Sequence, residues 1–585
     1  MNTEAIEAAK EWAQNPYFSE GERSEIQSLL DNKNHKEIEE RFYKDLEFGT
    51  GGMRSIIGFG PNRINKYTIR RATYALALQL KETFKDNIAV AISYDSRRFS
   101  FEFAKEVAQV FFGNNIKSYI FKRLNPVPLL SFSVRHHKAQ AGVMITASHN
   151  PPEYNGYKVY WNDGAQVTPP EDKLVIEKYN KINDFAEIPL KDFDKGVEEK
   201  MIIWVDEDVE QEYFNTILKH VINPKVCEQK GKELKIVYTA IHGTGGIPCT
   251  ALLDKMGLTS YEVVKEQQDP NENFPTVKSP NPENPEAMAM AVALMKKNKA
   301  DITFGTDPDT DRLGVAVLRK NGDVVYPNGN QIGVLMLHYI LTQKKDLGKL
   351  PQNGYFIKTI VTSNLQEKLA QSFGLKTYNT LTGFKWICGK MSEIEQNSPE
   401  AEFIFATEES FGYLPHPHVR DKDGVASLGL MAEVALFYKL KGMDLVDALD
   451  DIYEKYGFSN ETLLSLDYFG IEGAQKIDRI METFRNYQDS EFVEPIESLE
   501  DYQSLTIKNW ENKTTSPLNF TKSNVLGFQF KSGNKLYLRP SGTEPKIKFY
   551  IMISENEGSL QQKKGLAQSK TESFLAKIKE IADKA

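Results

Sequence analysis

The amino-acid sequence predicts an α/β protein of about four domains, in which helices cover mixed or parallel sheets. The chain has 585 residues, and domains contain roughly 150 residues each. Short apolar segments rich in β-branched residues alternate with segments of helical period, a pattern typical of α/β domains. The strand candidates end in polar loops rich in Gly, Pro and Asp. We therefore expect a site at strand ends, where open α/β sheets bind their ligands.

The composition indicates a folded, water-soluble protein. Hydrophobic residues make up 40% of the chain and charged residues 26%, which excludes long disorder, collagen and coiled coil. There is no run of about 18 apolar residues, and the first residues lack the basic and apolar regions of a signal peptide. Three cysteines without disulfide or zinc spacing fit a reducing compartment. We expect a cytoplasmic protein with no membrane partner.

The charge balance argues against nucleic acid as a partner. Lys and Arg number 72 against 81 Asp and Glu, a net charge of -9, whereas nucleic-acid binding usually needs a basic face. An anionic small molecule would therefore have to be held by a local cluster of cations.

Five segments are the clearest strand candidates, and each is followed by a loop that carries reactive or charged side chains. They are Asn87–Ser93, Ala141–Ile145, Lys235–Tyr238, Asp301–Phe304 and Glu402–Phe405, and their loops read YDSRR, TASHNPP, TAIHGTGG, GTDPDTDR and ATEESFGY. Such loops at strand ends indicate a site assembled from several sheets.

Changes in composition set the expected domain boundaries. The Pro- and Asn-rich residues 269–286 predict a long surface excursion, and a break follows the helix that ends near Tyr453–Phe458. The last 25 residues, Gln561–Ala585, form a charged amphipathic helix. The predicted domains are residues 1–205, 206–324, 325–453 and 454–585.

The first motif, TASHNPP, contains a candidate nucleophile. Ser148 is followed by His149, and Lys158 lies ten residues further on. A serine hydroxyl needs an activating neighbour, but the G-x-S-x-G elbow of hydrolases is absent, and adjacent Ser and His residues do not easily form a triad. The alternative is an ordinary turn built from Ser, Asn and Pro.

The second motif, DPDTDR, predicts a magnesium site. Asp307, Asp309 and Asp311 alternate on what we expect to be an extended segment, so their carboxylates project to one side, and Mg²⁺ prefers such oxygen ligands. An EF-hand is excluded because Arg312 and Leu318 occupy the positions of its glycine and glutamate. A solvated acidic loop is the alternative.

The third motif, RPSGTEP, predicts a phosphate-binding loop between two strands, called the phosphate grip below. Arg539 offers a bidentate fork, Ser541 and Thr543 offer hydroxyls, and the turn at Gly542 can direct backbone N–H groups at an anion. A plain hairpin turn remains the alternative.

The fourth motif, EESFGY followed by RDKDG, fits a sugar phosphate. Glu408 and Ser410 suit vicinal hydroxyls, and Lys422 could meet a phosphate; a helix N-cap is the alternative. Two further loops, FGTGGMR and LTGFKW, add one cation each, Arg54 and Lys385, without matching a Rossmann or P-loop template.

Together these motifs resemble the α-D-phosphohexomutase superfamily, the phosphoglucomutases and phosphomannomutases. The similarity runs in order from Phe48 to Pro545 and looks most like the branch that includes bacterial phosphoglucomutases and animal phosphopentomutase. It implies four domains around a central cleft, the first three mixed α/β sheets covered by helices and the fourth a smaller α+β domain. In chain order they would bear the phosphoserine, the metal, the sugar contacts and the phosphate grip.

The resemblance also implies a role for each motif residue. Ser148 would be the phosphoserine, its phosphate joining Asp307, Asp309 and Asp311 around one Mg²⁺. His149, Lys158 and Arg54 would surround the transferring phosphoryl group. The substrate contacts would be Arg312, Thr382, Gly383, Lys385, Glu408, Ser410, Lys422, Arg539, Ser541, Gly542 and Thr543.

The implied activity is that of a phosphoglucomutase, with glucose 1,6-bisphosphate as intermediate and activator. Phosphomannomutase and phosphopentomutase activity are alternatives, and a Mg-dependent sugar phosphatase or a sugar-phosphate binding protein are more remote ones. We expect a monomer or weak homodimer. His149 or Lys158, with a pKa lowered by the surrounding cations, would accept the proton of the sugar hydroxyl in the first transfer. Some members carry a histidine where this chain has Gly412, and we expect His416 and His418 to lie in a surface loop.

Overall fold

The computed structural model describes residues 3–49, 51–468, 470–541 and 546–585, of which 470 and 471 are described by their backbone alone. The chain forms two compact units. Unit 1 contains residues 1–326, 384–399 and 411–439, and unit 2 contains residues 327–383, 400–410 and 440–585. The expected division into four domains stays a prediction.

Unit 1 begins with three helices that pack on one another, α1 (Thr3–Gln14), α2 (Glu20–Asp31) and α3 (His35–Phe42). Helix α2 starts with a capping box, because the Ser19 side chain accepts from the Glu22 N–H while the Glu22 carboxylate accepts from the Ser19 N–H.

The first sheet of unit 1 is mixed, with the order β1-β5-β4-β2-β3-β6. Strands β2, β3, β4 and β6 run parallel, whereas β5 is antiparallel to both β4 and β1. The strands are β1 (Gly52–Ile56), β2 (Ala89–Tyr94), β3 (Lys117–Phe121), β4 (Ala141–Ile145), β5 (Tyr154–Trp161) and β6 (Ile202–Val205). Its helices are α4 (Lys66–Thr83), α5 (Ser100–Gly113), α6 (Val127–His136), α7 (Glu171–Lys181) and α8 (Phe193–Glu198).

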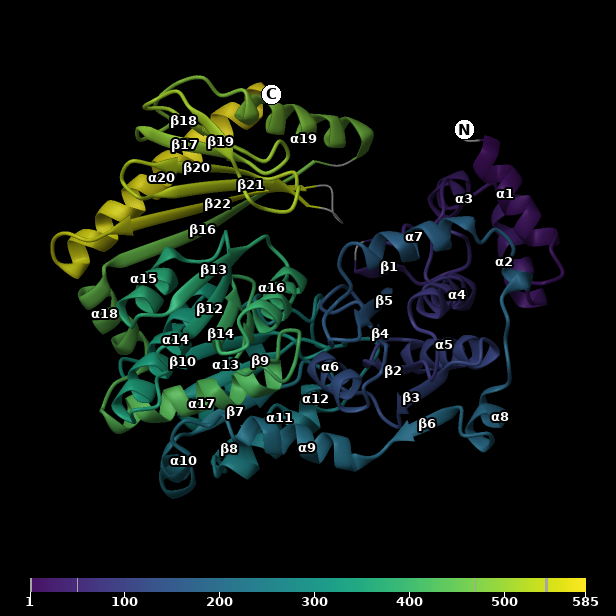
Figure 1. Ribbon diagram of the computed structural model, residues 1–585, viewed down its shortest axis with the longest axis horizontal. Helices are drawn as coiled ribbons and strands as arrows, with labels where there is room; N and C mark the ends of the chain where they lie inside the picture. Colours follow the sequence, from purple (N-terminus) through teal and green to yellow (C-terminus); the bar gives the residue numbers. More distant parts are fainter. Residues whose placement is uncertain (1–2, 50, 469, 542–545) are drawn as a thin grey trace. The chain divides into compact units, whose positions relative to one another are not determined.

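Strand β2 is buried on both faces, which is why its sequence is apolar throughout. Val90 and Ile92 pack in the cluster that includes α4 and α5, whereas Ala89 and Ala91 pack in the cluster that includes α6. Successive side chains of a strand point to opposite faces, so the two clusters form the two sides of an α/β/α layer (Figure 1).

The second sheet of unit 1 is also mixed, with the order β11-β10-β9-β7-β8. Its strands are β7 (Ile236–Thr239), β8 (Tyr261–Val263), β9 (Ile302–Thr306), β10 (Leu313–Leu318) and β11 (Val324–Val325). The helices of this region are α9 (Glu207–Leu218), α10 (Pro224–Lys230), α11 (Gly246–Met256), α12 (Lys265–Gln268) and α13 (Ala289–Asn298). The described residues 269–288 contain no helix or strand, as expected for the excursion. Unit 1 is completed by α16 (Phe384–Asn397), β15 (Gly412–Leu414) and α17 (Gly424–Leu440).

Unit 2 contains a parallel group of strands in the order β13-β12-β14 and a separate antiparallel sheet in the order β16-β22-β21-β20-β17-β18-β19. The parallel group consists of β12 (Gly354–Thr359), β13 (Lys376–Thr380) and β14 (Glu402–Glu408), with α14 (Gly329–Asp346), α15 (Asn364–Ser372) and α18 (Leu445–Tyr456). The antiparallel strands are β16 (Phe458–Asp467), β17 (Ile496–Asp501), β18 (Thr506–Asn509), β19 (Thr515–Pro517), β20 (Leu526–Phe530), β21 (Lys535–Pro540) and β22 (Lys546–Glu555). Helices α19 (Gly470–Arg485) and α20 (Leu560–Lys584) cover one face of this sheet and share its apolar core.

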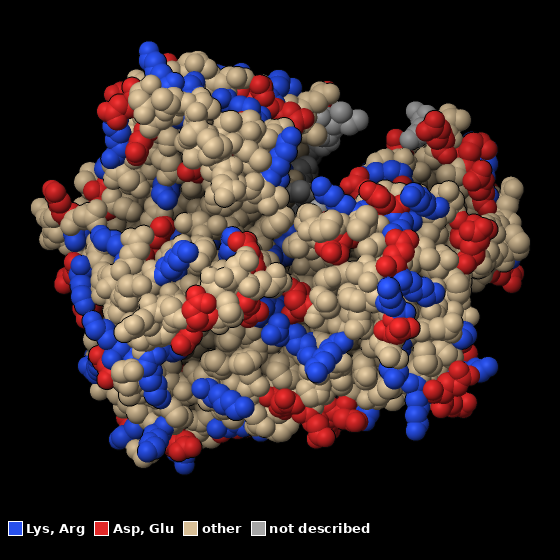
Figure 2. All heavy atoms as spheres, in the orientation of Figure 1, with Lys and Arg blue, Asp and Glu red and all other residues tan. Residues whose placement is uncertain are grey.

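The predicted fold class is confirmed: mixed sheets carry helices, and the C-terminal sheet with its two helices has α+β character. All five predicted strands are present, as β2, β4, β7, β9 and β14, and the C-terminal helix is α20. Among the described residues, no helix combines the length and apolarity needed to cross a membrane. On the face drawn in Figure 2, basic and acidic side chains are interspersed.

Candidate active site

Ser148 lies in the loop between β4 and β5, at the carboxyl end of a central strand. It is 3% exposed, and its φ of 51° is in the left-handed region. Its Oγ donates to Asp307 Oδ2 at 2.9 Å and lies 3.2 Å from His149 Nδ1. The structure therefore brings the serine motif and the aspartate motif together, although 159 residues separate them.

The three aspartates form a buried cluster that could hold a metal ion. One oxygen from each of Asp307, Asp309 and Asp311 lies within 4.8 Å of the others. Among the described residues, Asp309 Oδ1 and Asp311 Oδ1 are buried without a hydrogen-bond partner, which suits a site that a cation completes. Burial raises the pKa of Asp307 well above its ordinary value, and the charges of Asp309 and Asp311 raise it further.

The expected geometry of this segment was wrong. Residues 307–311 form a turn rather than an extended strand: Thr310 N–H donates to Asp307 O at 2.9 Å, and Thr310 has a φ of 53°. The carboxylates converge because the chain curls around them. The turn is joined to the loop before α17, since Gly424 N–H donates to Thr310 O at 3.1 Å, and a Cβ added at Gly424 would lie 2.5 Å from the same oxygen.

Two lysines neutralise part of this acidic cluster. Lys158, on β5, places Nζ 2.8 Å from Asp309 Oδ2 and 3.5 Å from Asp311 Oδ2, and Lys422 Nζ is 3.1 Å from Asp311 Oδ2. Burial by itself would raise the pKa of Asp311, but Lys422, Lys158 and Arg312 hold it below its ordinary value. Arg312 pairs with Glu283 and, more distantly, with Asp311, with Nε 3.9 Å from Oδ1.

Arg54 and His149 flank Ser148. Arg54, on β1, donates to Asn150 Oδ1 at 2.7 Å. Burial lowers the pKa of His149 well below its ordinary value, and the charges of Arg312 and Arg54 add to this effect, so the imidazole is neutral at pH 7. The expectation of a lowered pKa fails for Lys158: burial opposes its charge, but Asp309 and Asp311 raise its pKa.

Unit 2 brings together the sugar-loop residues and the arginine of the phosphate motif. Ser410 Oγ donates to Glu408 Oε1 at 3.1 Å, and Thr359 Oγ1 donates to Glu409 Oε2 at 3.2 Å. Arg539, on β21, is close enough to Glu409 for the two charges to interact. Burial and the neighbouring Glu408 raise the pKa of Glu409 to about 7, whereas Arg539 opposes this rise.

The other predicted contacts are distributed over both units. In unit 2, Thr382 and Gly383 follow β13, and Gly383 has a φ of 114°. Ser541 N–H donates to Lys546 O at 2.8 Å and closes the β21–β22 hairpin. Gly542 and Thr543 lie outside the described residues. In unit 1, Lys385 is the second residue of α16, and its Nζ lies 5.0 Å from the centroid of the Trp386 ring.

Two residues that the sequence analysis did not assign stand directly behind Ser148. Asp95 and Arg97 occupy the YDSRR loop after β2 and are 2% and 3% exposed. The sequence did mark the loop that bears them, because YDSRR is one of the five charged loops that follow predicted strands. Nothing in the spacing showed that its side chains point inward.

The expectation for the two histidines of the LPHPH stretch was wrong for one of them. His418 is exposed, but His416 is only 1% exposed, and its Nε2 lies 3.1 Å from Asp423 Oδ2. Asp423 also accepts from the Tyr213 hydroxyl at 2.8 Å. His416 is therefore part of a buried polar network next to Lys422 rather than of the surface.

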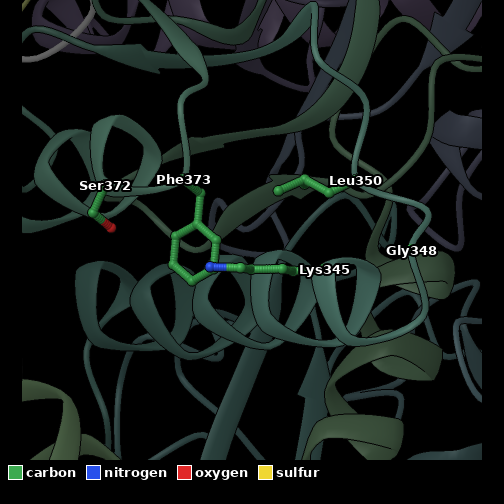
Figure 3. Close-up of a pocket in the computed structure, with 5 residues that line it drawn as sticks. All are labelled: Lys345, Gly348, Leu350, Ser372 and Phe373. Atoms are coloured by element: carbon green, nitrogen blue, oxygen red, sulfur yellow. The ribbon is translucent and has the colours of Figure 1, made fainter.

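Two pockets contain none of the predicted site residues. One, of about 320 Å³, is lined by residues of α2, α5 and the loop after β1 in unit 1. The other, of about 310 Å³, is lined in unit 2 by Lys345, Gly348, Leu350, Ser372 and Phe373. Figure 3 shows the Lys345 side chain across the Phe373 ring, with Nζ 5.4 Å from the ring centroid.

Three family models match most of the chain. They are described as phosphoglucomutase/phosphomannomutase alpha/beta/alpha domains I, II and III, and they match residues 45–185, 211–321 and 328–456. The phosphoglucomutase of Staphylococcus epidermidis is 35% identical over 534 residues, which cover 91% of this chain and 95% of the relative. That of Staphylococcus aureus is 38% identical over 519 residues, which cover 88% and 91%.

Solved structures agree with this chain in fold. The Paramecium phosphoglucomutase parafusin has a TM-score of 0.66 at 17% identity, over 92% of this chain and 96% of that structure. A phosphoglucomutase/phosphomannomutase family protein from Burkholderia thailandensis has a TM-score of 0.63 at 17% identity, over 91% and 97%.

Proposed function

This chain belongs to the phosphoglucomutase/phosphomannomutase family, and we propose that it interconverts glucose 1-phosphate and glucose 6-phosphate as a phosphoglucomutase. The observation that carries the proposal is the buried contact of 2.9 Å between Ser148 Oγ and Asp307. A serine held against three carboxylates is suited to carry a phosphoryl group beside a divalent cation.

The residues present fit Mg²⁺. Asp307, Asp309 and Asp311 would hold it, together with a phosphate on Ser148, since the three offer hard oxygen ligands and two of their oxygens are unpartnered among the described residues. When bound, the ion supplies positive charge that stabilises the transferring phosphoryl group. Lys158 and Lys422 also contact Asp309 and Asp311, so two positively charged side chains lie beside the carboxylates that would hold the ion.

The chain's own residues would divide the reaction between them. Phosphorylated Ser148 would give its phosphoryl group to the free hydroxyl of the sugar monophosphate, forming glucose 1,6-bisphosphate. The Ser148 Oγ–P bond would break as the sugar O–P bond forms, and the proton of the sugar hydroxyl would pass to Ser148 Oγ. The other phosphate would later return to Ser148. In the return step the Ser148 Oγ–H proton must leave as the new P–O bond forms. His149 is neutral and its Nδ1 is 3.2 Å from Oγ, so it can accept that proton.

We propose that Glu408, Ser410 and Arg539 recognise the sugar and the phosphate that is not reacting. Glu408 and Ser410 would accept and donate hydrogen bonds to sugar hydroxyls, and Arg539 would bind the phosphate. The remaining contacts would be Arg54, Arg312, Thr382, Gly383, Lys385, Lys422, Ser541, Gly542 and Thr543. A cytoplasmic monomer or weak homodimer remains part of the proposal.

One assay separates this function from its alternatives. Glucose, mannose, ribose and deoxyribose 1-phosphates are each supplied with Mg²⁺ and a catalytic trace of the matching bisphosphate, and isomerised product and inorganic phosphate are measured together. We expect the highest kcat/KM with glucose 1-phosphate and almost no phosphate release. Phosphate release equal to product formation would instead indicate a phosphatase, and a preference for mannose or pentose phosphates would assign another mutase.

Lys158→Met is expected to lower kcat by at least ~10²-fold. The reason is that Lys158 Nζ contacts Asp309 and Asp311 and would face the transferring phosphoryl group. Steady-state kinetics of the isomerisation measure the effect. Lys173→Met, which changes an exposed lysine of α7, is the matched control and should change kcat less than about twofold. Unchanged kinetics in Lys158→Met would remove this lysine from the mechanism.

Glu409→Gln is expected to flatten the pH dependence of KM. The pKa of Glu409 is raised to about 7, so above pH 7 its negative charge lies near Arg539 and opposes a bound phosphate. Wild-type KM for glucose 1-phosphate should therefore rise roughly threefold to tenfold between pH 6.8 and pH 8, and that of the variant should not.

The raised pKa of Glu409 also makes the stability of the folded protein depend on pH. Between pH 4.5 and 7 the folded state binds a proton at Glu409 that the unfolded state lacks, so wild-type stability gains as the pH falls through this range. Glu409→Gln should raise the free energy of unfolding at pH 8 by about 1 kcal/mol and should not raise it at pH 5. Glu402→Gln, at the exposed start of the same strand, is the control. If KM and the free energy of unfolding depend on pH in the same way in wild type and in Glu409→Gln, the raised pKa of Glu409 is contradicted.

A further inference from the structure

We propose that Arg97 and Asp95 are positioning residues that hold the backbone of Ser148 in its left-handed conformation and so direct its hydroxyl at the aspartate cluster. The proposal rests on the proposed function, in which Ser148 carries the transferred phosphoryl group. Neither residue contacts the reacting oxygen; both act through the loop that bears it.

The conformation of Ser148 requires support. Its φ of 51° is uncommon for a residue with a Cβ, because the left-handed region costs free energy for all residues except glycine. Such a conformation persists only where the surrounding structure fixes it. The hydrogen bonds that fix it are found on both sides of the residue.

On the carbonyl side of Ser148, the buried guanidinium of Arg97 binds several backbone carbonyls of the loop. Arg97 Nη2 donates to Ser148 O at 2.6 Å and also to Asn150 O, and Nη1 donates to Pro151 O at 2.8 Å and to Tyr154 O at 3.0 Å. Four carbonyls from residues 148–154 thus meet a single side chain. A guanidinium has donors arranged in a planar fork, whereas a lysine ammonium cannot reach four acceptors spread in this way.

On the amide side, the support runs through Thr146. Ser148 N–H donates to Thr146 Oγ1 at 2.8 Å, and Thr146 Oγ1 donates to Asp95 Oδ2 at 2.5 Å. The other oxygen of Asp95 accepts from the Arg97 N–H and the Ser100 hydroxyl, both at 2.9 Å. Both peptide groups of Ser148 are therefore tied to the same short loop after β2.

The charges and packing behind the loop make this support rigid. Arg97 Nε lies 3.5 Å from Asp95 Oδ2, and the guanidinium carbon is 5.1 Å from the centroid of the buried Phe274 ring. Arg97 therefore has an ion-pair partner beside it and an aromatic face beneath it. Rotation of Ser148 about φ would break the bond to Arg97 and would move Oγ away from Asp307, so loss of the support should affect the chemical step. A misplacement of about 1 Å can cost about 10²-fold in rate.

The test compares four proteins: wild type, Arg97→Ala, Arg97→Lys and the control Arg71→Ala. Arg71 is also a buried arginine of unit 1, at 5% exposure, and it donates to Tyr179 O and pairs with Asp45, away from the Ser148 loop. Initial rates of glucose 1-phosphate isomerisation give kcat and KM, with and without added guanidinium chloride at millimolar concentration. Thermal unfolding of each protein reports its stability.

We expect Arg97→Ala to lower kcat by at least ~10²-fold with KM changed less than about threefold, and guanidinium to restore at least about tenfold of the loss. Arg97→Lys, which keeps the charge and most of the volume, should lose at least ~10-fold in kcat. Arg71→Ala should lose stability without a comparable loss of kcat and without rescue. This rescue and the kcat-against-KM split would not follow from a merely structural role.

Two results would overturn the proposal: an unchanged kcat in folded Arg97→Lys, or equal losses and no rescue in the Arg97 and Arg71 variants. If Arg97→Ala does not fold, Arg97→Lys decides alone. An inactive wild type contradicts the proposed function, whereas an active wild type with an unaffected Arg97→Lys contradicts only the positioning role.

Discussion

Replacing Ser148 by alanine is expected to lower kcat for the isomerisation of glucose 1-phosphate by at least ~10⁴-fold. The hydroxyl is the only atom group removed, and it is the one that contacts both Asp307 and His149. Without it no phosphoserine can form, so phosphate cannot move between the two ends of the sugar by way of the enzyme. The measurement is the initial rate with saturating substrate, Mg²⁺ and a trace of glucose 1,6-bisphosphate, together with the intact mass of the protein before and after incubation with the bisphosphate.

The matched control for this variant is Ser133→Ala. Ser133 is a fully buried serine of α6, in the same unit, and its hydroxyl has no hydrogen-bond partner among the described residues. It should keep kcat within about twofold of wild type. Ser148→Ala should lack the mass increase of one phosphoryl group that wild type shows. Full activity of Ser148→Ala would rule out the phosphoserine mechanism.

Asp307→Asn is expected to change activity and stability in opposite directions. Activity should fall by about 10³-fold, because one ligand of the proposed cation is lost. Without metal the variant should be more stable than wild type at pH 8, since burial and the repulsion of Asp309 and Asp311 raise the pKa of Asp307 and so make its ionised form unfavourable. Addition of Mg²⁺ should raise the thermal midpoint of wild type and have little effect on the variant.

Metal removal provides the same test without mutation. Chelation by EDTA should abolish the activity of wild type and lower its thermal midpoint, and Mg²⁺ should restore both. Asp301→Asn is the control, because Asp301 directly precedes the same strand β9 and pairs with Lys439 instead. It should respond to Mg²⁺ as wild type does. A thermal midpoint of wild type that does not change with Mg²⁺ would contradict a metal site at the three aspartates.

The sequence predicted the strands and the meeting of the loops that follow them, but it did not predict the backbone geometry of a single loop or the burial of polar side chains. Apolar runs located β2, β4 and β9, and the strand-end loops brought Ser148 and Asp307 together as open α/β sheets require. The turn at residues 307–311 was missed, because three alternating aspartates are equally compatible with an extended segment until the hydrogen bond from Thr310 is known.

Burial of polar side chains was the least predictable property. His416 and His418 stand two residues apart in one polar stretch, yet only His416 is buried, because Asp423 and Tyr213 complete a network around it. Similarly, Arg97 stands in a charged loop of the kind that usually lies on the surface. Its side chain points inward because it donates to carbonyls more than 50 residues further along the chain. Neither partner set can be found from spacing.

The backbone bond between Gly424 and Thr310 has a consequence for protein engineering. Residues 411–424 are attached to residues 310–313 at three points, because Gly424 N–H donates to Thr310 O, Leu313 N–H donates to Phe411 O, and Arg312 forms a bridge with Gly412. A Cβ at residue 424 would collide with the turn. A graft of residues 411–424 from another protein would therefore have to bring a glycine at position 424 and a backbone that can pair with residues 310–313.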